Sequence, residues 1–235
     1  MNLTKTIQEE YTRLSKNEKS EIKQSKNARK LQELYEMWLD DIQTSNKLYY
    51  NVDVHYHYAR GLFRGAKQNY SLEDISYLSL FIDEQKEKEF YELSGSFLSA
   101  LINMHYERTK TKETYIIFTT GEADNGNYNC LEYVGFENEG ATIHVIGNVG
   151  TDLGVDMTSG SITIEGKMSG EIGSNMQGNI QIKGGLAYLY FHPFLFDAAE
   201  HNGTLIVNGT IDHLGANESG KNLKVIHNGK KLNFI

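Results

Sequence analysis

The chain has 235 residues, of which 39% are hydrophobic and 23% charged, and this length is sufficient for one large or two modest domains with a buried core. Its formal net charge of −8 argues against a nucleic-acid partner, because phosphate binding needs clustered Lys and Arg. The single cysteine, Cys130, excludes an internal disulfide framework and a cysteine-rich zinc site. The sequence has neither an apolar run of membrane-span length nor a signal-peptide pattern, so we expect a cytoplasmic protein that contacts no membrane.

Glycine divides the chain into two unlike halves. Only three of the 22 glycines, Gly61, Gly65 and Gly95, lie in residues 1–110, and all the others lie in 111–235. A shift of this size in composition indicates a domain boundary. We therefore predict an α-helical domain over residues 1–110 and a second, repetitive domain over 111–235.

Helical periodicity recurs along the first half of the chain. Five segments show it, namely residues 6–24, 27–45, 47–66, a stretch that begins with Ser71 and Asp74, and 89–108. Residues 47–66 also alternate as a strand would, but a lone strand here would have no partner, so a helix is favoured. In the last segment, Gly95, Ser96, Ser99 and Ala100 would permit close approach of another element.

The second half contains internal repeats. Residues 141–149, ATIHVIGNV, are echoed nineteen residues later by 160–168, GSITIEGKM, and a third copy follows with Ile180 and Ile182. Each copy has two apolar residues separated by a polar one, which places both apolar side chains on one face of a short strand. Stacking the copies in parallel would align Ile143, Ile162 and Ile180 in an internal ladder.

This pattern carries a family resemblance. The run GATIHVIGNVGTDLGVDMTSGSITIEGKMSGEIGSNMQGNIQIKGG, residues 140–185, resembles the GXGXG repeat domain found in the glutamate synthase large subunit and in formylmethanofuran dehydrogenase. The resemblance implies a right-handed parallel β-helix that supports neighbouring catalytic domains or subunits. The predicted fold class is therefore α+β, an α-helical domain followed by a β-helix solenoid. The repeat motif carries no catalytic residue to transfer.

Candidate chemistry is sparse. No nucleophile, metal or cofactor motif is complete, so we predict no catalytic residue, no metal and no cofactor. Asp152 and Glu171 occupy equivalent places in adjacent repeats, which predicts an acidic corner with partly raised pKa values. The tyrosine-rich first half offers one possible ligand groove, around His57, Arg60, Arg64 and His105.

An aromatic segment interrupts the repeats after Leu186. Its side chains are too apolar for an ordinary surface loop, and Tyr188, Tyr190, Phe191, Phe194 and Phe196 form a possible interaction surface. The segment is expected either to dock onto the chain's own helices, which is favoured, or to form an interface with another subunit. We predict a non-catalytic structural or protein-interaction scaffold that binds a protein partner or self-associates. The alternative is an enzyme or small-ligand-binding protein with its site between the helices and the repeats.

Overall fold

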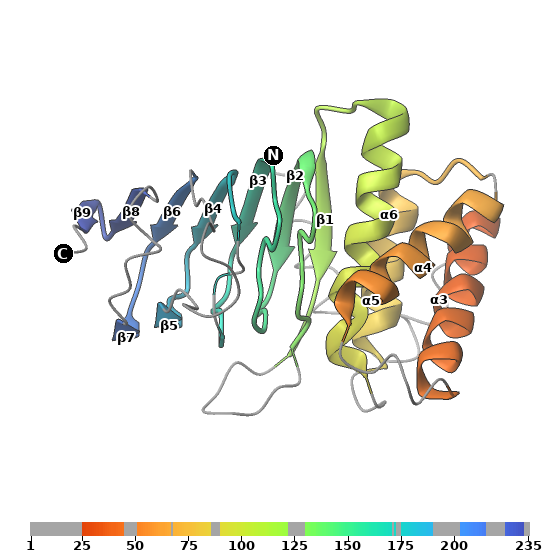
Figure 1. Cartoon of the computed structure of the whole chain (residues 1–235), viewed down its shortest axis with the longest axis horizontal. Coiled ribbons are helices and arrows are strands. Elements are labelled where there is room, and N and C mark those ends of the chain that lie inside the picture. Colours follow the sequence, from red (N-terminus) through yellow and green to blue (C-terminus); the bar gives the residue numbers. More distant parts are fainter. Residues whose placement is uncertain are drawn as a thin grey trace.

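The computed structural model describes residues 25–44, 51–66, 68–85, 90–121, 130–170, 172, 175–189, 203–214 and 224–232. In these residues the helices come first in the chain and the strands follow. The helices gather at one end of the molecule, and the strands succeed one another toward the other end (Figure 1).

Four α-helices and one 3-10 turn make up the helical part of the described chain. They are α3 (Lys26–Thr44), α4 (Val52–Ala66), α5 (Leu72–Asp83), η1 (Tyr91–Leu93) and α6 (Ser94–Thr109). The helices predicted over 27–45, 47–66 and from Ser71 are confirmed, and Ser71 and Asp74 form a reciprocal capping box. The segment predicted as one helix over 89–108 begins with η1 before α6. The helix predicted over 6–24 lies outside the described residues.

Aromatic rings fill the space between the helices. Phe97 of α6 is central, with ring centroids 5.3 Å from Tyr35, 5.1 Å from Trp38 and 4.9 Å from Phe63. All four side chains are at most 1% exposed. Aromatic pairs at these separations add to the burial of apolar surface, so Phe97 joins α6 to both α3 and α4.

Seven of the described strands form one sheet. Its order is β1 (Thr114–Phe118), β2 (Glu139–Ile146), β3 (Ser159–Ile164), β4 (Asn179–Ile182), β6 (Thr204–Val207), β8 (Lys224–His227) and β9 (Lys230–Leu232). All neighbours pair in parallel except β8 and β9, which are antiparallel. Strands β5 (Leu186–Leu189) and β7 (Ile211–Leu214) pair separately in a two-stranded parallel sheet.

The predicted ladder is confirmed by the strand register. Ile143 pairs with Ile162, and Ile162 pairs with Ile180, each at most 1% exposed. The row continues through Leu205 and Val225. One apolar row therefore crosses the sheet from β2 to β8, because the two-residue alternation aims the same positions inward in each copy.

The turns between strands also repeat. Glu137, Asp156 and Asn175 stand nineteen residues apart and all adopt a left-handed backbone conformation, with φ between 50° and 54°. The Asn175 side chain donates to the Asp156 carboxylate at 2.7 Å. Isolated parallel bridges, Leu131 to Val149 and Val149 to Met168, continue the stacking outside the named strands.

The predicted fold class, with its right-handed parallel β-helix, is wrong. The described residues form an α+β structure in which regular strand pairing is concentrated in one seven-stranded, mostly parallel sheet beside four helices, and no solenoid is indicated. The repeat period determines which strands pair and in which register. It does not determine the conformation of the intervening residues, which here contribute turns, isolated bridges and the small β5–β7 sheet.

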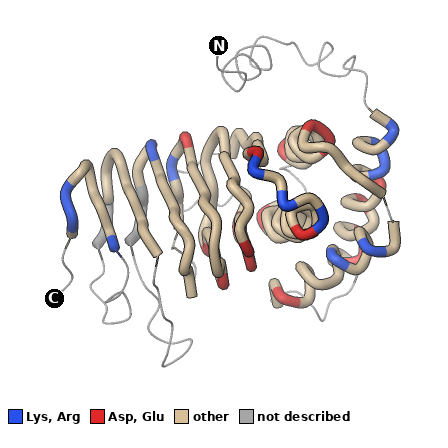
Figure 2. The backbone as a smooth tube through the Cα atoms, turned by 90° about the horizontal axis from the view of Figure 1, so that it is seen from above, with Lys and Arg blue, Asp and Glu red and all other residues tan. Residues whose placement is uncertain are grey.

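The two edges of the main sheet are protected differently. At one edge α5 packs against β1. At the other, β9 has three residues, and its Lys230 and Lys231 are exposed. Figure 2 shows basic residues in blue at this end of the tube, next to the C-terminus. Short edge strands that carry lysine resist pairing with another chain, so the more elaborate protection lies at the helical end.

Candidate functional site

The candidate site is the junction where the helices meet the first strand and the loop that precedes β2. Among the described strands, β1 has a neighbour on one side only, and the backbone N–H groups of its outer side need acceptors. Two side chains of α5 supply them. Ser79 Oγ accepts from the Phe118 N–H at 3.0 Å, and the Asp83 carboxylate accepts from the Thr120 N–H at 2.7 Å. Helix α5 thus provides hydrogen-bond acceptors that a neighbouring strand would otherwise provide.

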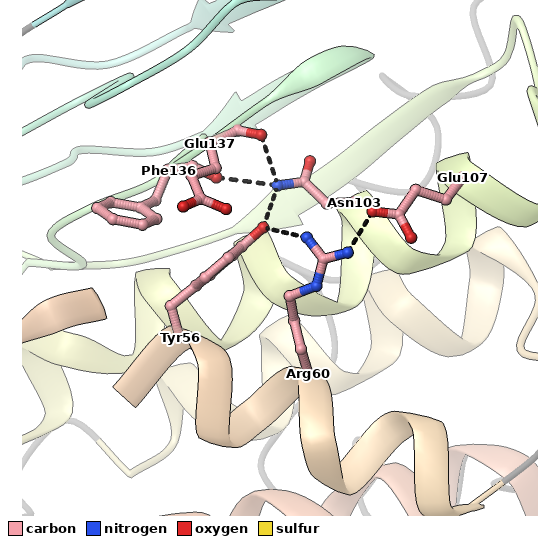
Figure 3. Close-up of polar contacts among 6 residues, drawn as sticks. All are labelled: Tyr56, Arg60, Asn103, Glu107, Phe136 and Glu137. Carbon is pink, nitrogen blue, oxygen red and sulfur yellow. Dashed lines mark hydrogen bonds and ion pairs between the residues drawn. The ribbon is translucent and has the colours of Figure 1, made fainter. Parts of the chain in front are cut away.

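Helix α6 makes the equivalent contacts with residues 133–137. Ser99 Oγ accepts from the Gly135 N–H at 2.8 Å. Asn103 Nδ2 lies within 3.0 Å of the carbonyl oxygens of Phe136 and Glu137 and 2.8 Å from the Tyr56 hydroxyl (Figure 3). One amide therefore joins α6, α4 and the loop before β2, with two hydrogens shared among three acceptors.

These polar residues share a spacing that the sequence contains. Ser79 and Asp83 stand four residues apart on α5, and so do Ser99 and Asn103 on α6. Residues four apart lie on one face of a helix, and all four residues are at most 6% exposed. Polar residues that recur at this spacing on an otherwise apolar helix face were the feature of the sequence from which these four residues could have been predicted. The sequence pattern indicated Ser99 only as a small residue, and the roles of Ser79, Asp83 and Asn103 were missed.

We expect Asn103→Ala to lower the free energy of unfolding by about 2 kcal/mol, because two buried carbonyl groups lose their donor. Chemical denaturation monitored by circular dichroism measures the change. Asn179→Ala, at an exposed position on β4, is the matched control and should change stability by less than about 0.5 kcal/mol. Equal effects of the two substitutions would contradict a structural role for the Asn103 amide.

An ion pair closes the outer side of this junction. Arg60 of α4 pairs with Glu107 of α6 and also donates to the Tyr56 hydroxyl at 3.1 Å (Figure 3). Burial raises the pKa of Tyr56 to about 12, although hydrogen bonds from Asn103 and Arg60 oppose the shift. The Tyr56 phenol therefore stays protonated at neutral pH.

Three residues of the predicted ligand groove, His57, Arg60 and Arg64, lie on α4, and His105 lies on α6. Arg60 belongs to the network with Tyr56 and Glu107. His57 and Arg64 lie exposed on α4, whereas His105 lies half-buried on α6 with Nδ1 2.8 Å from the Tyr115 hydroxyl. Burial lowers the pKa of His105, so its imidazole is neutral at pH 7. His105 also lines a small cavity that includes none of the other three.

A group of acids, Glu92, Glu132 and Asp152, lies near η1. Glu132 is partly buried and its backbone N–H donates to the carbonyl oxygen of Glu92 in η1 at 2.8 Å. Burial raises the pKa of Glu132 to about 7, and the negative charges of Asp152 and Glu92 add to the shift. The predicted neighbour of Asp152 in the next repeat, Glu171, lies outside the described residues. The acid that precedes Asp152 in the neighbouring turn, Glu132, was missed because the repeat pattern in the sequence is clear only from Ala141 onward.

Glu132 makes stability depend on pH. Its pKa is higher in the folded state than the ordinary 4.5, so the folded state binds the proton more tightly than the unfolded state does. Protonation of Glu132 therefore contributes to the free energy of unfolding at low pH, and this contribution is lost as pH rises from about 4.5 through about 7. We expect Glu132→Gln to raise the free energy of unfolding at pH 8 by up to about 3 kcal/mol and to change it little at pH 4. Denaturation curves at the two pH values measure this difference, and an equal gain at both would contradict it.

A charged row crosses the outward face of the sheet. Glu165, after β3, accepts from His144 Nε2 of β2 at 2.6 Å and from Lys183 Nζ, after β4, at 2.7 Å. Burial by itself would raise the pKa of Glu165, but the hydrogen bonds and charges of Lys183 and His144 together lower it. Three successive repeats are thereby joined on their exposed side as well as in their core.

The remaining predicted surface lies mostly beyond the described residues. Tyr188 is in β5, whose backbone pairs it with His213 of β7. Tyr190, Phe191, Phe194 and Phe196 lie outside the described residues. Within the described part of the chain, no group of three potential metal-ligating side chains occurs, and no helix has the length and apolarity needed to cross a membrane.

Comparison with known proteins found no matching family model, no similar curated protein and no similar solved structure.

Proposed function

We propose that the protein is a non-catalytic scaffold that binds a protein partner or self-associates. The observation that carries the proposal is the attachment of α5 to the β1 edge of the sheet, and of α6 to the loop before β2, by buried side chains that accept from or donate to the backbone there. Hydrogen bonds of this kind hold two elements in one arrangement, since each buried group would otherwise be unpaired. The helices and the sheet thus form a body suited to presenting a surface of constant shape.

The surface of the sheet supports the same proposal. The strand register aligns Thr142, Ser161, Asn179 and Thr204 in one row across four strands. Short polar side chains in register form a hydrogen-bonding face, and the contacts of Glu165 with His144 and Lys183 join neighbouring strands across it. Such a face can contact a large partner without being reshaped.

Affinity purification of the full-length protein from its native cells tests the proposal. We expect a partner, or a second copy, to co-purify in a fixed stoichiometry. Mass spectrometry identifies the partner, and light scattering after size exclusion measures the oligomeric state. Recovery of the protein alone and as a monomer would contradict the scaffold.

Surface variants locate the interaction without disturbing the core. Thr163→Arg with Gln181→Arg alters the centre of the outward sheet face, whereas Glu36→Arg with Asp40→Arg alters the exposed side of α3. We expect one pair to abolish co-purification while the other leaves it unchanged, both with wild-type melting temperatures. Loss of binding in both pairs would indicate nonspecific charge effects and would contradict a defined interface.

A further inference from the structure

Strand β9 forms the edge of the main sheet that the helices do not cover. Among the described strands it pairs with β8 alone. Figure 1 shows it at the end of the molecule remote from the helices. Along such an edge, alternate residues direct their backbone N–H and C=O groups away from the sheet. The turn that precedes β9 determines which of its residues does so.

That turn is a tight two-residue hairpin. Asn228 and Gly229 both have positive φ, 46° and 77°, as a type I′ turn requires. In a two-residue hairpin the flanking residues, His227 and Lys230, exchange backbone hydrogen bonds with each other. The next residue of β9, Lys231, therefore belongs to a pair that exchanges none.

The bonds on the other side of β8 agree with this register. The Lys224 N–H donates to the Gly203 carbonyl at 3.1 Å, and the Asn228 N–H donates to the Val207 carbonyl at 3.0 Å. Every second residue of β8 thus faces β6, and the residues between them face β9. Lys231 lies opposite a residue that faces β6, so its own N–H and C=O groups point away from the sheet.

Side chains of the hairpin hold this edge in place. Asn228 Oδ1 accepts from the Gly209 N–H at 3.0 Å. His227 Nε2 donates to the Gly209 carbonyl at 2.7 Å. The hairpin is therefore fixed to the neighbouring repeat, and a strand that pairs with β9 need not pay for ordering it.

The edge is basic although the chain as a whole is acidic. Strands β6, β8 and β9 contain Lys224, Lys230 and Lys231, all exposed, and no acidic residue, whereas the net charge of the chain is −8. Within the described part of the chain, none of the three lysines belongs to an ion pair. Like charges directly opposite each other destabilise a strand pair and opposite charges stabilise it. The edge therefore disfavours a second copy of β9 and favours an acidic strand.

Leu232 adds an apolar requirement. It pairs with Val225, at the end of the inward apolar row, and packs half-buried against the core. Side chains alternate between the two faces of a strand, so Leu232 points inward and Lys231 outward. A strand added beside β9 extends the row if it places an apolar side chain opposite Leu232.

We propose that the outer edge of β9 binds an acidic, extended segment of a partner protein as an additional antiparallel strand. Lys231 and one acidic residue of the segment exchange two backbone hydrogen bonds, which antiparallel pairing allows with a single residue. The preceding residue of the segment is apolar and lies opposite Leu232, and the following one is acidic and lies opposite Lys230. The recognised order is apolar, acidic, acidic. This inference rests on the proposed function in that the segment belongs to a protein, but it concerns the edge of the sheet and not its outward face.

Titration of the full-length protein with a short acetylated and amidated peptide centred on Ile-Glu-Glu, followed by NMR, tests the proposal. We expect saturable shifts of the backbone amides in β8 and β9. The exchange of the Lys231 amide hydrogen with water should also slow at least about tenfold at saturation, because that N–H becomes paired.

Two altered peptides separate strand pairing from charge attraction. N-methylation of the first Glu keeps both carboxylates but removes the backbone donor, and should weaken binding at least about tenfold. The peptide with Ile-Lys-Lys keeps the backbone and reverses the charges, and should give no saturable shifts.

Charge reversal in the protein locates the binding edge. Lys231→Glu should weaken binding of the Ile-Glu-Glu peptide at least about fivefold and should bind an Ile-Lys-Glu peptide better than wild type does. Lys26→Glu, at an exposed position of α3, makes the same change in net charge and should bind as wild type. Both variants alter exposed side chains, so both should keep the wild-type melting temperature.

The proposal is overturned if the Ile-Glu-Glu peptide gives no saturable shifts, if the N-methylated peptide binds equally well, or if Lys26→Glu weakens binding as much as Lys231→Glu. A dimer in which the Lys231 amide is already protected would make a second copy the occupant and would also overturn it. The scaffold function fails separately, because it is contradicted when nothing co-purifies, whether or not the peptide binds.

Discussion

Ile164→Asp is expected to unfold the sheet, with a loss of more than about 4 kcal/mol in the free energy of unfolding. Ile164 is fully buried and pairs with Val145 on one side and Ile182 on the other. A carboxylate at this position has no partner in an apolar row, and an unpaired buried charge is among the most destabilising single changes. Far-ultraviolet circular dichroism during urea denaturation measures the loss.

The neighbouring residue supplies the control for this substitution. Thr163 lies on the opposite face of β3 and is partly exposed. Thr163→Asp introduces the same charge on the solvent side, where we expect a change of less than about 1 kcal/mol. If Ile164→Asp melted at the wild-type temperature, the inward assignment of β3 would be incorrect.

Gly95→Ala is expected to destabilise the protein by about 3 kcal/mol. A Cβ atom at residue 95 would lie 1.8 Å from the Glu132 carbonyl oxygen and 3.1 Å from Val134 Cγ2. The carbonyl belongs to a stretch of backbone that Ser99 and Asn103 hold against α6, so neither this backbone nor the helix can move without weakening those hydrogen bonds. The helix must move away from the first repeat and weaken the contacts of the junction.

Gly61→Ala is the matched control for this effect. Gly61 lies in α4, and apart from the backbone of that helix and the adjacent residues, no atom of the described residues is within 4 Å of the position its Cβ would take. Alanine there lowers the entropy of the unfolded chain and favours the helix, so we expect a gain of about 0.5 to 1 kcal/mol. Thermal unfolding of both variants separates the two expectations. A stable Gly95→Ala variant would show that α6 does not pack closely on residue 132.

Periodicity determined the helices and the strand register. The apolar spacing within 27–45 identified α3, and the two-residue alternation identified the inward row of Ile143, Ile162 and Ile180. Over 47–66 the spacing fitted both a helix and a strand, and α4 was predicted because a lone strand would have no partner. These features are local, because the side-chain period of a segment is set by its own backbone geometry. They could therefore be predicted before any partner element was known.

The sequence by itself determined which faces are buried and which repeats stand side by side. Only the tertiary structure decided that regular pairing is concentrated in one main sheet and that Ser79 and Asp83 complete its helical edge. It also decided that Ser99 and Asn103 bind the loop before β2, and that His105 and Arg60 have different partners. The physical reason is that the periodicity of apolar residues predicts which side of an element a side chain occupies, but not which other element it contacts. Edge completion and cavity formation depend on contacts between segments more than thirty residues apart, such as Asn103 with Phe136 and Ser79 with Phe118.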